Sequence, residues 1–158
     1  MIKLVCVGRI KEKALQSLIE EYLKRLQPYT KVAIIEVDDV MAPQSNSEAQ
    51  NEQVMNNEGK KLLSQIKDNE YVILLDLKGQ MWDSLELAEQ LDKIQTYTSP
   101  DITFVIGGSL GTSKEVFVRA DAKWQLSKLT FVHQMVRLIV LEQIYRSYKI
   151  RRNEPYHK

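Results

Sequence analysis

Residue types that can move protons lie mainly between Ile106 and Lys158. Both histidines of the chain, His133 and His157, fall in this segment. An imidazole titrates near neutral pH and can accept or return a proton during a reaction. Two histidines and one cysteine show no metal-ligand spacing, so no metal site is predicted. A Ser–His–Asp triad is not excluded by the composition of the chain.

Positive charge is concentrated in the same part of the chain. The whole 158-residue sequence has a formal net charge of +1. Residues 119–158 contain nine Lys or Arg and three Asp or Glu, a net +6, so residues 1–118 carry −5. Such asymmetry is typical of a surface that binds an anion such as nucleic acid, or of a basic solvated tail. Composition alone does not decide between these two interpretations.

The last eight residues, 151–158, combine cations with one aromatic side chain, Tyr156. Tyr156 could stack on a base while the cations neutralise phosphates. The alternative is a frayed and solvated terminus, which is common at chain ends. An aromatic residue in the final Tyr-His-Lys triplet favours a functional tail.

Two backbone segments upstream could hold a ligand. Residues 107–111 (GGSLG) follow an apolar run, but their spacing matches neither a dinucleotide fingerprint nor a P-loop. Their glycines could let the backbone approach a ligand closely, or the segment could be a plain tight turn. Residues 126–131 (LSKLTF) offer main-chain amides, two hydroxyls and apolar walls, which suit an adenine and a ribose but also an ordinary loop.

The segments that must position these residues alternate between strand-like and helix-like patterns. Apolar runs predict strands, and apolar residues at helical spacing predict helices. We expect a turn at residues 78–80, a loop at 38–47, Ser47 and Ser84 as helix N-caps, and a basic tail from Lys149. The predicted strands are 1–8, 31–37, 71–77, 101–106 and 124–126, and the predicted helices are 13–26, 48–67, a helix following Ser84, 114–118 and 132–148.

This alternation predicts one α/β domain over residues 1–158, with a mostly parallel sheet and helices on both faces. Ligands of such sheets bind beyond the carboxyl ends of the strands. Residues 75–79 and 106–108 occupy such positions. The last helix is apolar nearly all round, which favours burial against a second subunit, although one wide face packed on the sheet is the alternative.

Other function classes are excluded or disfavoured by composition. No apolar run approaches the ~20 residues that cross a bilayer, and the N-terminal apolar segment is too short for a signal peptide. The lone cysteine, Cys6, lies in an apolar run and is predicted to be a buried thiol in a reducing compartment. We therefore expect a cytoplasmic protein without membrane contact.

Taken in order, several motifs resemble one family. They are Lys3 to Gly8, Tyr22-x-x-Arg25-Leu26, Leu75-Asp76 with Gly79, Ile106-Gly107-Gly108-Ser109-x-Gly111, Leu126-Ser127-x-Leu129-Thr130-Phe131-x-His133-Gln134-Met135-x-Arg137, Glu142-Gln143-x-Tyr145-Arg146 and Pro155-Tyr156-His157-Lys158. The combination covers essentially the whole chain. It resembles the ribosomal large-subunit pseudouridine methyltransferase H family, within the SPOUT class of knotted methyltransferases.

The resemblance implies a fold, a reaction and a set of contacts. The fold would contain a deep trefoil knot near the C-terminus, and the protein would be a homodimer. It would bind S-adenosyl-L-methionine in the knot and methylate N3 of a pseudouridine in the helix 69 loop of 23S rRNA within the ribosome. The cofactor contacts implied by position are Leu75, Gly107, Leu126, Ser127, Lys128, Leu129, Thr130 and Phe131.

Roles in that reaction follow from residue type. Methyl transfer to an imide nitrogen needs alignment of the two reactants and removal of the N3 proton. His133 and His157 are the candidate bases, although His133 could simply begin a helix. Arg137 could stabilise the developing oxygen charge, and Tyr156 could stack on the base or hold the cofactor. The expected phosphate contacts are Arg146, Lys149, Arg151, Arg152 and Lys158.

Two other functions remain open from the sequence. A non-catalytic RNA-binding or ribosome-associated dimer could keep the fold without taking up S-adenosyl-L-methionine. An α/β nucleotide-binding regulator would not need the basic tail, and steeply salt-dependent RNA binding would argue against it.

Overall fold

A computed structural model describes residues 1–41 and 47–158 of the chain. Part of the loop predicted at 38–47 therefore lies outside the described residues. The elements, in chain order, are β1 (Ile2–Val7), α1 (Lys13–Leu26), β2 (Val32–Val37), α2 (Glu48–Leu63), β3 (Tyr71–Met81), α3 (Ser84–Tyr97), β4 (Ile102–Ile106), α4 (Lys114–Arg119), β5 (Ala122–Gln125) and α5 (His133–Arg151).

The five strands form one parallel sheet in the order β2-β1-β4-β3-β5. The central strands β1 and β4 are buried along their whole length. Their continuous apolar sequences suit strands that are covered on both faces. The predicted parallel α/β sheet is thus confirmed, and the carboxyl ends of all five strands meet at one edge.

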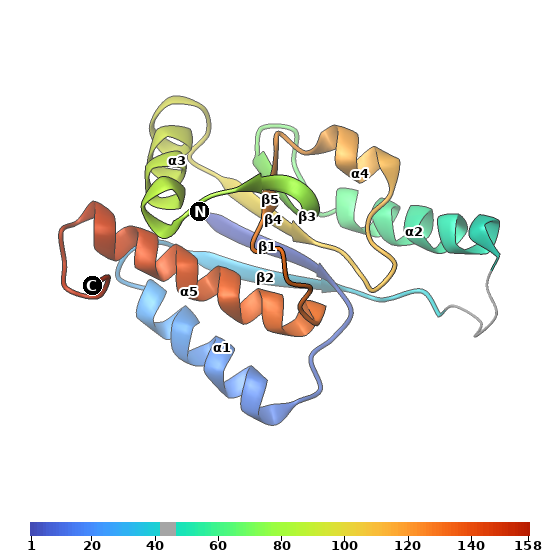
Figure 1. Ribbon diagram of the computed structural model, residues 1–158, viewed down its shortest axis with the longest axis horizontal. Coiled ribbons are helices and arrows are strands. Elements are labelled where there is room, and N and C mark those ends of the chain that lie inside the picture. The colour runs from blue at the N-terminus through green and yellow to red at the C-terminus, as the bar shows by residue number, and fades with distance from the viewer. Residues whose placement is uncertain (42–46) are drawn as a thin grey trace.

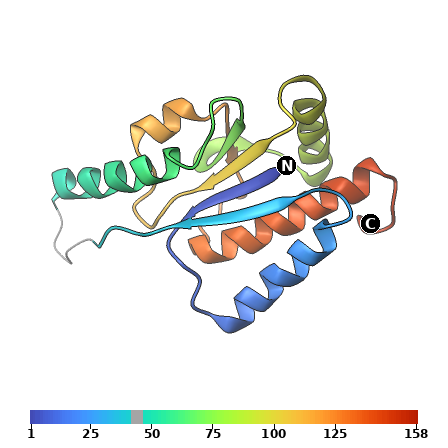
Figure 2. The same ribbon diagram turned by 180° about the vertical axis from the view of Figure 1, so that it is seen from behind.

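Helices cover both faces of this sheet, as predicted (Figure 1, Figure 2). Helices α1, α3 and α5 share one core cluster with Leu4 and Cys6 of β1, whereas α2 and α4 share the other with Val5 and Val7. Successive side chains of a strand point to opposite faces, so β1 alone contributes to both cores. The wide apolar face of α5 packs against α1 and α3 of its own chain.

Two predicted boundaries are wrong for identifiable reasons. Residues 78–80 do not turn the chain, because β3 continues to Met81 and pairs again with β5 after a register shift between Leu75 and Gln80. A Cβ on Gly79 would lie 2.6 Å from the backbone carbon of Lys123, so glycine is required at this bulge. Asp83, not Ser84, caps α3, because its carboxylate accepts the Glu86 N–H at 2.8 Å.

The remaining boundaries lie within three residues of the prediction, except that α2 ends at Leu63 and not at residue 67. Helix α1 has the predicted limits, and Ser47 caps α2 in a reciprocal pair with Gln50. Helix α5 begins one residue later and ends three residues later than predicted, because residues 149–151 continue it. The trefoil knot stays a prediction at this stage.

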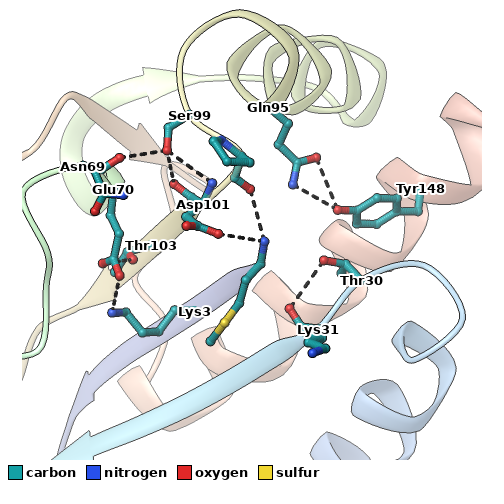
Figure 3. A network of polar contacts seen from close by, with 12 residues as sticks. Lys3, Thr30, Lys31, Asn69, Glu70, Gln95, Ser99, Asp101, Thr103 and Tyr148 are labelled. Atoms are coloured by element: carbon teal, nitrogen blue, oxygen red, sulfur yellow. Dashed lines mark hydrogen bonds and ion pairs between the residues drawn. The ribbon is translucent and has the colours of Figure 1, made fainter.

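A buried polar network closes the amino-terminal edge of the sheet (Figure 3). Lys3 of β1 donates 2.7 Å to Glu70 Oε1, and Thr103 of β4 donates 2.8 Å to Glu70 Oε2. Ser99 donates to the Asn69 and Asp101 carbonyls, and Gln95 of α3 bonds Tyr148 of α5. A buried ion pair is tolerated when each charge is hydrogen-bonded. Side chains of the protein itself fill this edge, so the opposite, carboxyl edge of the sheet is the one open to a ligand.

Candidate functional site

Strand register brings the implied cofactor residues to the carboxyl edge of the sheet. Leu74 pairs with Val105 and Leu75 pairs with Trp124. Leu75 lies on β3, Gly107 directly follows β4, and residues 126–131 follow β5. Because β4, β3 and β5 are neighbours in the sheet, the three segments lie side by side toward its carboxyl edge. Parallel sheets bind their ligands at this edge, so the three segments are placed where they can contact one ligand.

The loop 126–131 presents main-chain groups to a ligand. Lys128, Leu129 and Thr130 are exposed, and Ser127 Oγ accepts the Leu129 N–H at 3.0 Å. Within residues 1–41 and 47–158, positions 127–131 make no backbone–backbone hydrogen bond. Main-chain groups without a backbone partner, beside the apolar Leu126 and Phe131, can bind the ring nitrogens and hydroxyls of a nucleoside, so the loop fits an adenosine-type ligand.

Gly107 is required by the loop itself. A Cβ at this position would lie 2.6 Å from Thr112 Cγ2 and 3.2 Å from the Gly111 carbonyl oxygen. Gly108 and Gly111 form an isolated bridge, and Gly111 has φ +94. A side chain at Gly107 would therefore push residues 107–112 out of this tight turn.

The C-terminal tail is folded back along α5. Asn153 adopts a left-handed φ of +52, which ends the helix and reverses the chain. Tyr156 then donates 3.0 Å to Glu142 Oε1, and its ring packs 4.8 Å from the Tyr145 ring centroid. Burial, with hydrogen bonds to Tyr22 and Glu142, raises the pKa of Tyr156. The tail is thus docked by its aromatic residue, with a phenol that donates.

His157 is oriented by a guanidinium. Arg146 Nη1 lies 3.1 Å from His157 Nδ1, while Arg146 Nε donates 3.1 Å to Glu142 Oε1. A guanidinium can only donate, so His157 Nδ1 accepts and the neutral ring carries its proton on Nε2. His157 is an exposed residue, so its Nε2–H can donate a hydrogen bond to a ligand in this arrangement.

Arg137 is buried completely and is not available to a ligand. Its Nη1 donates 2.6 Å to Glu36 Oε2, and its Nη2 donates 2.9 and 2.8 Å to the carbonyls of Val7 and Gly8. The side chain is 1% exposed. This guanidinium joins α5 to the ends of β1 and β2. We therefore assign Arg137 a positioning role in place of contact with the reacting base.

His133 begins α5 and lines a cavity of about 280 Å³ at the carboxyl edge. Burial, assisted by the positive charge of Arg137, lowers the pKa of His133 from its ordinary value, and Asp39 opposes that shift. The imidazole is therefore neutral at pH 7 and able to accept a proton.

The His133 shift predicts a titration order and a stability trend. Its folded pKa lies below the ordinary 6.5, so protonation favours the unfolded chain. Its contribution to stability is present above about pH 6.5 and is lost as the pH falls through the folded pKa. Histidine NMR titration, with His133→Gln to assign the signal, should give a midpoint below 6.5. A midpoint at or above 6.5 would contradict this electrostatic description.

The predicted catalytic residues form two groups that one chain does not bring together. Tyr156 reaches back only to Glu142, nine residues after His133 on α5. At 1.5 Å per residue this leaves about 14 Å along the helix axis. The loop leading into α5 and the chain end lie toward opposite ends of this helix (Figure 1). Reacting atoms must approach to about 3–3.5 Å, and this separation is too large for the tail to act at residues 126–131 of the same chain.

The predicted phosphate contacts differ in their availability. Arg146, Lys149 and Arg151 pair with Glu142, Glu154 and Asp92, respectively. Arg152 and Lys158 are exposed. Phosphate binding by the first three must therefore compete with carboxylates of the same chain.

One functional candidate, Glu58, was missed by sequence reasoning. It lies in α2, is 5% exposed and lines the same cavity as His133. The sequence does contain a pattern that indicates burial of Glu58. Val54, Glu58 and Leu62 recur at four-residue spacing and lie on the buried stripe of α2. A carboxylate on an apolar helical stripe indicates a specific partner.

The described part of the chain contains no group of three His, Cys, Asp or Glu side chains placed to hold a metal ion. A search of the same residues found no helix long and apolar enough to span a membrane.

Comparison with known proteins points to one family. A family model described as a predicted SPOUT methyltransferase matches residues 1–157. A protein of Carboxydothermus hydrogenoformans is 50% identical over 157 residues, which is 99% of each chain. Relatives from Lactobacillus delbrueckii subsp. bulgaricus and Lactobacillus acidophilus are 51% and 49% identical over the same share. All three relatives carry the name ribosomal RNA large subunit methyltransferase H.

Proposed function

Because the chain belongs to the SPOUT methyltransferase family, and within it to the ribosomal RNA large subunit methyltransferase H group, we propose that it methylates 23S rRNA. The acceptor is N3 of a pseudouridine in the helix 69 loop, within the cytoplasmic ribosome. The supporting observation is identity of about half of all positions over 99% of the chain. One domain over residues 1–158 carries the activity.

The methyl donor we propose is S-adenosyl-L-methionine, which supplies an electrophilic methyl group on a sulfonium. The main-chain groups of residues 127–131, which make no backbone–backbone hydrogen bond, bind its adenosine, and Leu75 and Phe131 supply apolar walls. Gly107 keeps the turn after β4 tight, so that this turn forms another side of the cofactor site at the carboxyl edge. These residues hold the donor in line with the acceptor nitrogen, which is the main requirement of a displacement reaction.

The two histidines take different parts in this proposal. His133 is neutral and accepts the N3 proton as the nitrogen attacks. His157 presents Nε2–H to a base carbonyl and stabilises the charge that develops on its oxygen. Tyr156 orders the tail against α5 and keeps His157 in place.

A homodimer with the family's trefoil knot completes this site in the proposal. The tail lies too far from the cofactor loop of its own chain, so a second copy must deliver it. Leu129, Val132 and Met135, around the start of α5, expose 68, 60 and 49% of their surface, as expected of an interface. A monomer mass in analytical ultracentrifugation would contradict the dimer.

Mapping of 23S rRNA by mass spectrometry tests the proposed reaction. Cells that lack this gene should lose one methyl group on one pseudouridine of helix 69, and the gene supplied in trans should restore it. An unchanged methylation pattern would refute the proposal. Calorimetry separates it from a non-catalytic RNA-binding dimer, which would show no saturable uptake of S-adenosyl-L-methionine.

A further inference from the structure

The cavity between α2 and the start of α5 lies beside the implied cofactor edge but shares none of its residues. Gly108, which lines the cavity, directly follows Gly107 of the cofactor edge. Apolar walls come from Val7, Val54 and Leu110, whereas Glu58 and His133 supply polar groups. A volume of about 280 Å³ is small for a cofactor and suits one planar ring.

Glu58 presents one carboxylate oxygen to this cavity. Its Oε2 accepts the Val40 N–H at 3.1 Å, whereas its Oε1 accepts no hydrogen bond from residues 1–41 or 47–158. A Cβ on Gly108 would lie only 3.0 Å from Oε1, so the glycine leaves this oxygen accessible. A buried carboxylate without a full set of donors is costly, and a ligand N–H would remove that cost.

Charge in the cavity selects the kind of group that can enter. Asp39 also lines the cavity, so two carboxylates oppose the approach of a phosphate. A base that has been flipped out of an RNA stack carries no charge and is read by hydrogen bonds to its edge. The phosphates can stay with the basic tail while the ring alone enters.

We propose that this cavity holds the target ring, with Glu58 Oε1 accepting N1–H of pseudouridine. The inference rests on the proposed function. In pseudouridine the sugar is attached to C5, so N1–H is free in addition to the N3–H that faces the methyl donor. In uridine the sugar occupies N1, and a C–H stands in the corresponding place. Glu58 is then the residue that distinguishes pseudouridine from uridine.

Glu58→Gln reverses the polarity of the cavity with little change in shape. The Val40 N–H needs an acceptor, so the amide oxygen of the glutamine turns toward it. The NH2 group is then left facing the cavity, where it opposes N1–H. A site built for one hydrogen bond strongly rejects a ligand with the wrong partner.

The experiment measures kcat/KM on two sets of ribosomes from cells without this gene. One set carries the helix 69 pseudouridine, and the other comes from cells that also lack the pseudouridine synthase for that loop. Glu58→Gln should lower kcat/KM on the pseudouridine ribosomes about 100-fold and change it less than about threefold on the uridine ribosomes. Glu52→Gln, an exposed charge change on the same helix, should leave both values unchanged.

A second variant and a binding measurement keep the result decisive. Gly108→Ala covers Oε1 and should lower transfer to both substrates, with the affinity for S-adenosyl-L-methionine unchanged. An unchanged preference for pseudouridine in Glu58→Gln would overturn the inference. So would a tenfold loss of affinity for S-adenosyl-L-methionine, because the cavity would then hold the cofactor's ammonium group. If the unmodified protein methylates neither ribosome, the proposed function itself fails.

Discussion

A chain that ends at Glu154 is expected to keep its fold and to lose methyl transfer to ribosomal RNA. The deletion removes Tyr156 and His157, whose side-chain hydrogen bonds within the described residues go to α1 and α5. It also removes the Nε2–H that we place on the base carbonyl. Loss of such a positioned group typically costs about 10²- to 10⁴-fold in rate. Initial rates on ribosomes that lack the methyl group measure the effect.

Two matched measurements separate a catalytic tail from a structural one. Removal of Lys158 alone should lower the rate far less than the longer deletion, because it removes one phosphate contact while the docked tyrosine and histidine remain. The longer deletion should shift Tm by less than about 4 °C and leave the affinity for S-adenosyl-L-methionine unchanged. Full activity of the chain ending at Glu154 would remove the tail from the mechanism.

Arg137→Met is expected to destabilise the protein more than any surface arginine change. Methionine fills similar space, but it removes the donor to the Val7 and Gly8 carbonyls and leaves the Glu36 carboxylate with the Ile10 N–H in place of the ion pair. Because Glu36 is partly exposed, we expect a loss of about 2–4 kcal/mol in the free energy of unfolding. For a chain of this size that lowers Tm by about 5–15 °C.

The control is another arginine of α5 that also pairs with a carboxylate. Arg151 bonds Asp92, which is 57% exposed, so Arg151→Met should cost less than about 1 kcal/mol. Thermal unfolding of both variants at one protein concentration provides the comparison, because assembly would make Tm concentration-dependent. Equal shifts for the two variants would show that Arg137 is not the buried link that its contacts indicate.

Local sequence was sufficient for most of the fold. Apolar runs located all five strands, and helical spacing with Pro28 defined both ends of α1. The errors occurred where a distant segment decides the local structure. Residues 78–80 have turn chemistry, yet pairing of Gln80 and Met81 with β5 holds them in a strand. Propensity is overridden when a backbone partner is available.

The sequence indicated the residues of the candidate site less completely than it indicated the strands and helices. The strand register places Leu75, Gly107 and residues 126–131 on the same side of the sheet, and their role as cofactor contacts stays a prediction. Arg137 was assigned to the substrate because a cation near a histidine suggests catalysis, but its contacts run inward. The sequence alone did not identify Glu58, because a single acidic residue in a polar helix is typical of a solvent-exposed helix face.

The sequence by itself determined the parallel α/β architecture, the basic C-terminus and the order of the family motifs, because each depends on nearby residues. Only the tertiary structure decided which groups face a ligand. Burial commits Arg137 to Glu36 and leaves Glu58 Oε1 open to a cavity, although both are charged residues on helices. Side-chain partners come from segments more than a hundred residues away, and no local pattern records those contacts.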